Sequence, residues 1–222
     1  MRHENDDAAA RPTPSRLSMN QSAGARSNGL RWHLREATAG LHDQADALGG
    51  AYDLRSRAGY AAFLSAHARA LPGLEAAVAE ALPPGAMPDW PRRRRAASLL
   101  TDLARLELPV PHALPVAPLG SAAAAWGMAY VLEGSRLGNA MLLKAVRTSP
   151  TLAEAGADAY LSHRPDSEGW PGFVARLEQA LPDPAFWPQA GQGARAAFHV
   201  FLDALRSGRA PISDRAEYAT HE

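Results

Sequence analysis

One histidine of this chain lies on a polar stripe of an otherwise apolar helical segment. Residues three and four positions apart are neighbours on a helix, and this stripe consists of Arg35, Thr38, His42 and Asp46. An imidazole that binds a metal through one ring nitrogen usually donates its other N–H to a carboxylate or a carbonyl. Asp46 follows His42 by one turn and is placed to be that acceptor. The pattern favours His42 as an axial iron ligand; the alternative is a hydrogen-bonded surface histidine.

A second histidine competes for that role. His67 lies in the apolar helical pattern of Tyr60, Phe63 and Leu71, where it points more squarely into the core face than His42 does. No carboxylate stands three or four residues after it, so the pattern favours a hydrogen-bonded core histidine. The chain has no HExxH or CxxC motif, which argues against a zinc site.

Three glycines interrupt a second strongly helical segment. Gly127, Gly134 and Gly138 are spaced by seven and four residues, which predicts that they share one helix face. Each costs about 0.8–1 kcal/mol relative to alanine in a helix interior, so a reason for their presence is expected. Two reasons remain open. The bare face could admit another helix, or it could let a kinked helix lie over a flat cofactor.

Composition bounds the class of protein. The 222 residues are 46% hydrophobic and 21% charged, which is typical of a globular domain with a real core. The formal net charge is zero and no nucleic-acid-binding motif occurs, so nucleic acid is not an expected partner. The absence of cysteine excludes disulfides, thiolate-ligated haem and iron–sulfur clusters. No long apolar run or export signal is found, so we expect a cytoplasmic protein without a membrane span.

The elements that position these residues are expected to be helices throughout, in a single all-α bundle. Alanine and leucine dominate, β-branched runs are few and the apolar spacing is helical. Capping and stop signals place helices at about 29–48, 57–81, 89–106, 121–146, 151–162, 171–181 and 189–206. We expect a disordered tail over 1–28, a helical domain over 29–208 and a C-terminal tail over 209–222. The arginine run 92–95 is interpreted as solvated first turns of a helix.

Taken together, the two segments resemble the haem oxygenase family, and most closely its bacterial members, including those associated with bacteriophytochromes. The segment 34–38 followed by His42 is similar to the family's proximal helix, and the segment 130–138 is similar to the bacterial distal helix. A later stretch, Gly169–Trp170 with Phe173 and Leu177, resembles a family pattern that helps to close the bundle. The resemblance covers about residues 30–205.

The resemblance implies a fold, an activity and a set of site residues. It implies a multi-helix bundle that cleaves haem b to biliverdin with release of iron and CO, using O₂ and an external donor of ferredoxin or flavoprotein type. His42 would ligate the iron, Asp46 would orient it, and Gly134 and Gly138 would let the distal helix approach the haem. In members associated with bacteriophytochromes, the biliverdin would pass to that photoreceptor. The alternative that stays open is that the reaction serves to release iron.

The chain also departs from the family's pattern. The second glycine of the usual distal pair is Asn139, which is expected to add bulk near the haem. The aspartate that many members use to anchor distal water corresponds most nearly to Ser135, which can both donate and accept a hydrogen bond. Thr38 and Arg35 share the proximal stripe, and Arg35 is the favoured propionate partner. The weaker propionate candidates are Arg136 and Arg195.

Two functions from other classes stay open. The substitutions at Ser135 and Asn139 motivate a non-catalytic haem carrier or sensor on the same fold. The third hypothesis is a helical bundle that binds no haem and uses its glycine face for a partner.

Overall fold

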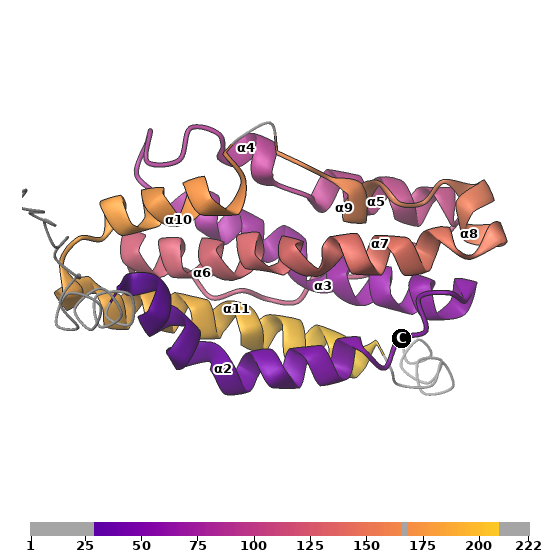
Figure 1. Cartoon of the computed structure of the whole chain (residues 1–222), viewed down its shortest axis with the longest axis horizontal. Coiled ribbons are helices and arrows are strands. Elements are labelled where there is room, and N and C mark those ends of the chain that lie inside the picture. Colours follow the sequence, from indigo (N-terminus) through magenta and orange to yellow (C-terminus); the bar gives the residue numbers. More distant parts are fainter. Residues whose placement is uncertain (1–28, 166–167, 209–222) are drawn as a thin grey trace, which may run out of the picture.

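The computed structural model describes residues 29–165 and 168–208, and within these ranges every regular element is a helix. Figure 1 shows the arrangement of the helices. They are α2 (Leu30–Gly49), α3 (Arg57–Ala81), α4 (Trp90–Arg93), α5 (Ala96–Arg105), α6 (Ala122–Gly134), η1 (Ser135–Gly138), α7 (Asn139–Arg147), α8 (Pro150–Ala155), α9 (Ala159–Ser162), α10 (Gly169–Ala180), η2 (Pro184–Phe186) and α11 (Trp187–Ser207). The prediction of an all-α fold is confirmed, and the expected tails lie outside the described residues.

Several helix ends follow the local chemistry of the sequence. The hydroxyl of Ser56 accepts a hydrogen bond from the Gly59 amide and caps α3, and Ser121 caps α6 in the same way. Gly208 follows the last residue of α11. The predicted range of α3 is confirmed residue for residue. The N-cap of α2 is Gly29, and no side chain of the described residues caps this helix end.

Three helices that the sequence predicts as continuous are broken. The third is divided into α4 and α5 because Arg94 adopts an extended conformation between them. The fourth is divided into α6, η1 and α7 by the 3₁₀ turn Ser135–Gly138. The segment predicted as one helix over 151–162 forms α8 and α9, separated after Gly156, whose positive φ of 62° ends α8.

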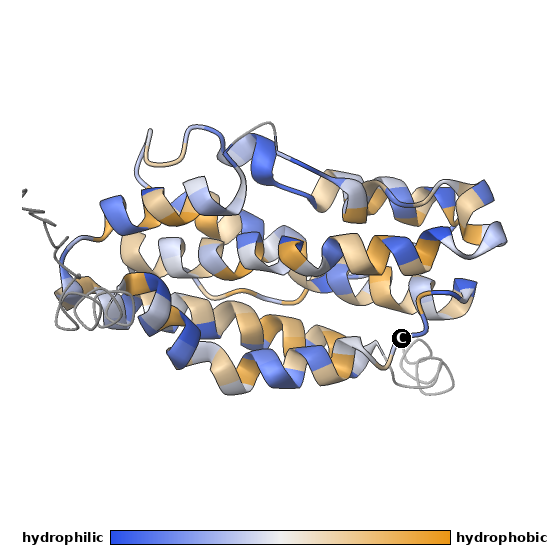
Figure 2. Cartoon of the chain, in the orientation of Figure 1, coloured by the Kyte–Doolittle hydropathy of each residue, from blue (hydrophilic) through white to orange (hydrophobic). Residues whose placement is uncertain are grey.

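The core is built around α11, which packs against α2, α3 and α6. Figure 2 shows apolar residues along these helices and polar ones on their outer sides. Two glycines bring α6 and α11 together: a Cβ on Gly127 would lie 1.8 Å from the carbonyl oxygen of Ala190, and one on Gly193 would lie 1.9 Å from that of Ala124. Close helix packing therefore explains Gly127.

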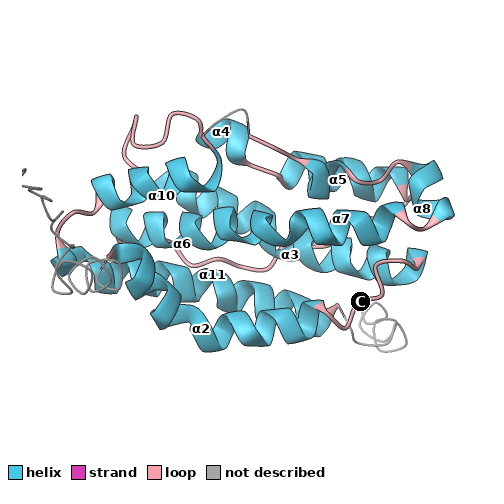
Figure 3. Cartoon of the chain, viewed as in Figure 1, coloured by secondary structure: helices cyan, strands magenta, loops and turns pink. Residues whose placement is uncertain are grey.

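The proline-rich segment before α6 runs along α3 as a loop (Figure 3). The amide of Leu114 donates to the carbonyl of Arg69 at 2.7 Å, and Val116 lies against Gly73. This segment covers α3 and returns the chain to the start of α6. Within the described ranges, none of the helices has the length and apolar character needed to cross a membrane.

Candidate functional site

The exposed side of α2 carries the histidine and carboxylate that the sequence pairs. His42 Nδ1 lies 3.1 Å from Asp46 Oδ2, and the two side chains are 62% and 73% exposed. The edge of the Phe198 ring, on α11, lies against the imidazole with the ring centroids 6.0 Å apart. Because Asp46 engages Nδ1, Nε2 is the ring nitrogen that can bind a metal.

The other two residues of the predicted stripe, Arg35 and Thr38, differ in their exposure. Arg35 is exposed, and its guanidinium carbon lies 5.2 Å from the centre of the Trp32 ring. Thr38 is buried and its hydroxyl donates to the carbonyl of Leu34 at 2.7 Å. The prediction that Thr38 lies on one polar stripe with His42 is wrong, because its side chain lies on the packed side of α2 and its hydroxyl is bonded within the helix.

Gly134 and Gly138 take no part in the contact with α11 that Gly127 makes. A Cβ on Gly134 would touch the Trp170 ring at 3.5 Å, whereas none of the described residues would lie within 4 Å of a Cβ on Gly138. Gly127 and Gly134 both lie in α6, seven residues apart, so the prediction of one common face is wrong only for Gly138, which is rotated away because the 3₁₀ turn advances about 120° per residue instead of about 100°. Gly138 therefore leaves open backbone on the surface, and Gly134 packs under an aromatic ring.

Large apolar side chains surround that open backbone. Leu137 is 62% exposed and Met141 is 74% exposed, and both lie within three residues of Gly138. Asn139 points the other way: its side chain is buried and its Nδ2 has no hydrogen-bond partner among the described residues. The expectation that Asn139 adds bulk near the haem stays a prediction, and the inward direction of this side chain argues against it.

The two candidate segments do not pack against one another. α2 packs on α11 and α10, whereas α7 packs on η1, α8 and α9, and no extended interface joins α2 to α7 in the described structure. At the other end, α2 approaches α6 at Tyr130. Burial raises the pKa of Tyr130, and the positive charges of Arg31 and Arg35 oppose that rise. This end therefore gathers two cations and a phenol that could receive carboxylates.

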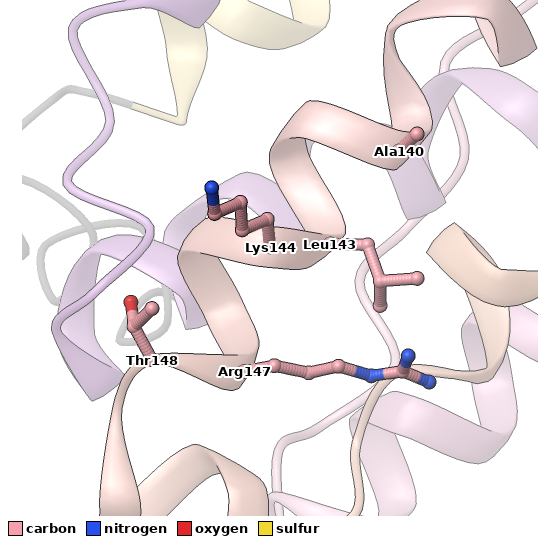
Figure 4. Close-up of a pocket in the computed structure, with 5 residues that line it drawn as sticks. All are labelled: Ala140, Leu143, Lys144, Arg147 and Thr148. Carbon is pink, nitrogen blue, oxygen red and sulfur yellow. The ribbon is translucent and has the colours of Figure 1, made fainter.

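A pocket of about 310 Å³ lies on the surface of α7, away from α2. Figure 4 shows its lining, in which Lys144 points away from Leu143 and Arg147. The lining residues are Ala140, Leu143, Lys144, Arg147 and Thr148. None of them comes from the helix of His42, and Arg147 is already bonded to Asp158 at 2.7 Å. The pocket is therefore separate from the His42 face.

Two members of the arginine run 92–95 are buried, so the interpretation of that run as solvated is wrong for them. Arg93 and Arg95 are each 1% exposed. Arg93 donates to Asp89 and Glu133, both at 2.7 Å, which balances its charge. Burial raises the pKa of Asp89, but the hydrogen bonds from Arg176 and Arg93 outweigh burial and lower this pKa to about 2.

Arg95 connects three helices. Its amide donates to the buried carboxylate of Glu75 on α3 at 2.6 Å. Its Nη2 donates to the carbonyl of Leu132 at 2.9 Å and to the hydroxyl of Ser135 at 2.8 Å. The Ser135 hydroxyl in turn donates to the same Leu132 carbonyl at 2.8 Å. Ser135, expected to hold distal water by donating and accepting, is therefore already engaged on two sides.

The two weaker propionate candidates differ in their surroundings. Arg136 donates to Glu133 at 3.0 Å, to His163 at 3.0 Å and to the carbonyl of Arg93. Burial and the charge of Arg95 lower the pKa of Arg136 to about 10. The guanidinium of Arg136 is thus held inside the protein and is not free for a propionate. Arg195 is half-buried on α11.

His67 is a core histidine, as its sequence pattern favours. Its Nδ1 donates to the carbonyl of Phe63 at 2.9 Å, and its ring lies among those of Phe63, Tyr160 and Phe201. Burial lowers the pKa of His67 to about 4.

Sequence reasoning missed Tyr130, Arg31 and Arg95 as members of the site or its support. Arg31 precedes Arg35 by one helical turn, which was a usable signal. For Arg95 the sequence contains no such signal, because the hydrogen-bond partners of this residue lie 20 to 40 residues away in the chain.

No family model matches the chain. The chain is 39% identical over 153 residues to a protein described as heme oxygenase from Xanthomonas campestris, a match that spans 68% of this chain and 92% of the relative. Its fold is similar to that of the NO- and CO-bound heme oxygenase of Neisseria meningitidis, with a TM-score of 0.69, 26% identity and coverage of 82% and 92% of the two chains. The extent and identity of the first match show that this chain belongs to the haem oxygenase family.

Proposed function

We propose that this protein binds haem through His42 and cleaves it oxidatively to biliverdin, iron and CO. The observation that carries the proposal is the pairing of His42 with Asp46 on an exposed face of α2, in a family member whose α2 and α7 do not pack together. An exposed histidine held by a carboxylate through Nδ1 has its other nitrogen in position for a ligand.

The residues present fit a haem group. Leu137 and Met141 expose large apolar surface that a porphyrin would cover, and Gly138 leaves the backbone beside them accessible. The cationic end of α2 at Arg31 and Arg35, near Tyr130, suits the propionates. The apolar surface and the charged end thus match the two halves of an amphiphilic tetrapyrrole.

The chain's own residues hold and orient the substrate. His42 would bind the iron as a neutral imidazole, and Asp46 would keep its Nδ1 proton and its ring orientation. Bound haem supplies the iron at which O₂ is activated, with electrons from an external ferredoxin or flavoprotein. Gly138 would keep a side chain out of the distal space, and Ser135 would offer an oxygen to distal water. This positioning would direct oxidation to the porphyrin ring.

Two questions follow from this proposal: which protein receives the biliverdin, and whether the bound haem is cleaved at all. The resemblance of the two segments together to bacterial members, which include those associated with bacteriophytochromes, supports a photoreceptor as the recipient of biliverdin. A non-catalytic haem carrier is the second candidate, and the engagement of the Ser135 hydroxyl by Leu132 and Arg95 favours it, since that hydroxyl has no proton to spare.

Haem titration followed by turnover separates these functions. We expect the wild-type protein to bind haem and, with ascorbate under air, to lose the Soret band while a biliverdin absorption grows in the red. His42→Ala should lose the axial imidazole signal and turnover, and added imidazole should restore the signal. His199→Ala, exposed on α11, is the matched control and should behave as wild type. A stable ferrous-oxy spectrum would identify a carrier, and an axial signal that survives in His42→Ala would refute ligation by His42.

A further inference from the structure

The methionines of the chain differ widely in their exposure. The sequence has five methionines and no cysteine, so a thioether is the one kind of sulfur group that an oxidant can meet. Met87 is 5% exposed and Met128 is fully buried, whereas Met141 is 74% exposed, the highest value among the large apolar side chains of the described residues. Met1 and Met19 lie outside those residues. Within the described ranges, Met141 is therefore the accessible sulfur.

Met141 lies where the proposed function places the substrate. It follows Gly138, the N-cap of α7, by three residues, a spacing that makes the two positions neighbours on a helix surface. None of the described residues would lie within 4 Å of a Cβ on Gly138, and the side chain of Leu137 is 62% exposed. Leu137, Gly138 and Met141 form one exposed surface, which we call the distal apolar patch. A flexible, polarizable thioether suits contact with a flat aromatic ring such as a porphyrin.

Oxidation of the thioether would make this patch polar. A lone pair of the sulfur attacks one oxygen of hydrogen peroxide, the O–O bond breaks, an S–O bond forms, and the second oxygen leaves as water with both protons. Sulfur loses two electrons and the peroxide gains them, so no further oxidant is needed. A porphyrin lying over the resulting sulfoxide would bury a strong hydrogen-bond acceptor against apolar side chains, which costs free energy.

We propose that Met141 is an oxidation site of the haem-free protein and that its sulfoxide weakens haem binding. Hydrogen peroxide is the two-electron reduction product of O₂, the co-substrate of the proposed reaction, so peroxide would slow the uptake of haem when O₂ reduction is not coupled to cleavage. Reduction of the sulfoxide by methionine sulfoxide reductase would restore uptake. This inference rests on the proposed function, because it takes haem to cover the distal apolar patch.

The first test needs no haem. The haem-free protein is treated with hydrogen peroxide, and peptide mass spectrometry follows the gain of one oxygen at each methionine. Met141 should oxidise more than about tenfold faster than Met87 and Met128, which peroxide reaches only when the fold opens. Equal rates at the three residues would overturn the proposal.

The second test is a spectroscopic haem titration before and after peroxide treatment, with the peroxide removed by catalase. Oxidised wild-type protein should bind haem about tenfold more weakly, and methionine sulfoxide reductase should restore the affinity. Met141→Leu keeps an apolar side chain of similar size that peroxide does not oxidise, so treatment should leave its own affinity unchanged. Because this variant retains the other methionines, it is the matched control for their oxidation. An equal loss of affinity in treated Met141→Leu would overturn the proposal.

Failure of this role and failure of the proposed function give different results. Absence of haem binding by untreated wild-type protein would overturn the proposed function, and the control by Met141 with it. Normal haem binding that stays unchanged after full conversion of Met141 to the sulfoxide would overturn the control by Met141 alone.

Discussion

Gly134 and Gly138 lie one helical turn apart and have different neighbours. Gly134 packs beneath Trp170, whose ring also contacts Tyr130, so this glycine closes the bundle where α10 crosses α6. Gly138 has open space around it and stands between Leu137 and Met141, the two most exposed large apolar side chains of this region. The described fold itself therefore does not require glycine at position 138. The haem group proposed above would account for it.

Substitution of Gly138 separates these roles. Gly138→Ala should leave the unfolding free energy of the haem-free protein unchanged or raise it by up to about 1 kcal/mol, because alanine favours helix and meets no neighbour. The same variant should bind haem more weakly and turn it over more slowly, as measured by titration and biliverdin formation. Gly40→Ala adds a methyl to open space on α2 and is the control. Unaltered haem affinity in Gly138→Ala would mean that haem does not lie against this turn.

At the scale of elements, the sequence predicts helices well and their breaks poorly. Apolar periodicity locates α2, α3, α10 and α11 within two residues because each buries one continuous face. The breaks after Arg93 and Gly134 depend on Glu75 and Arg95, contacts across 20 or more residues that no local pattern contains. In the candidate site, too, local contacts could be predicted from the sequence and long-range contacts could not. His42 and Asp46 are one turn apart and were predictable, whereas Tyr130 enters only through packing of α6 near α2.

The contact of α6 with α11 gives a prediction at this scale. Gly127→Ala would place a methyl carbon 1.8 Å from the Ala190 carbonyl oxygen, so the two helices must separate. We expect a loss of about 2–4 kcal/mol in unfolding free energy, measured by urea denaturation. Gly40→Ala, with the same chemical change in open space, should stabilise the protein slightly. Equal effects of the two substitutions would show that α6 and α11 are not in close backbone contact.

Over the whole molecule, the buried charged residues of the described ranges lie on, or at the N-caps of, α3, α4, α5 and α6. Asp102 on α5 accepts from the amides of Ala159 and Tyr160 and so caps α9, much as Glu75 caps α5. His67, on α3, lies among aromatic rings and carries no charge near neutral pH. Folding therefore depends on keeping this interior in one protonation state.

That dependence predicts loss of stability in mild acid. Burial lowers the pKa of His67 from 6.5 to about 4, so between these values the unfolded chain binds a proton that the folded protein does not. The unfolding free energy should fall as pH drops from 6.5 to 4, by about 2–3 kcal/mol from His67, with a smaller share from His163, whose pKa burial also lowers. Urea denaturation of the haem-free protein across this range measures it. His67→Gln keeps a donor for the Phe63 carbonyl and should flatten the slope, whereas His199→Gln, at an exposed position, should not. A slope that persists in His67→Gln would place the titrating group elsewhere in the molecule.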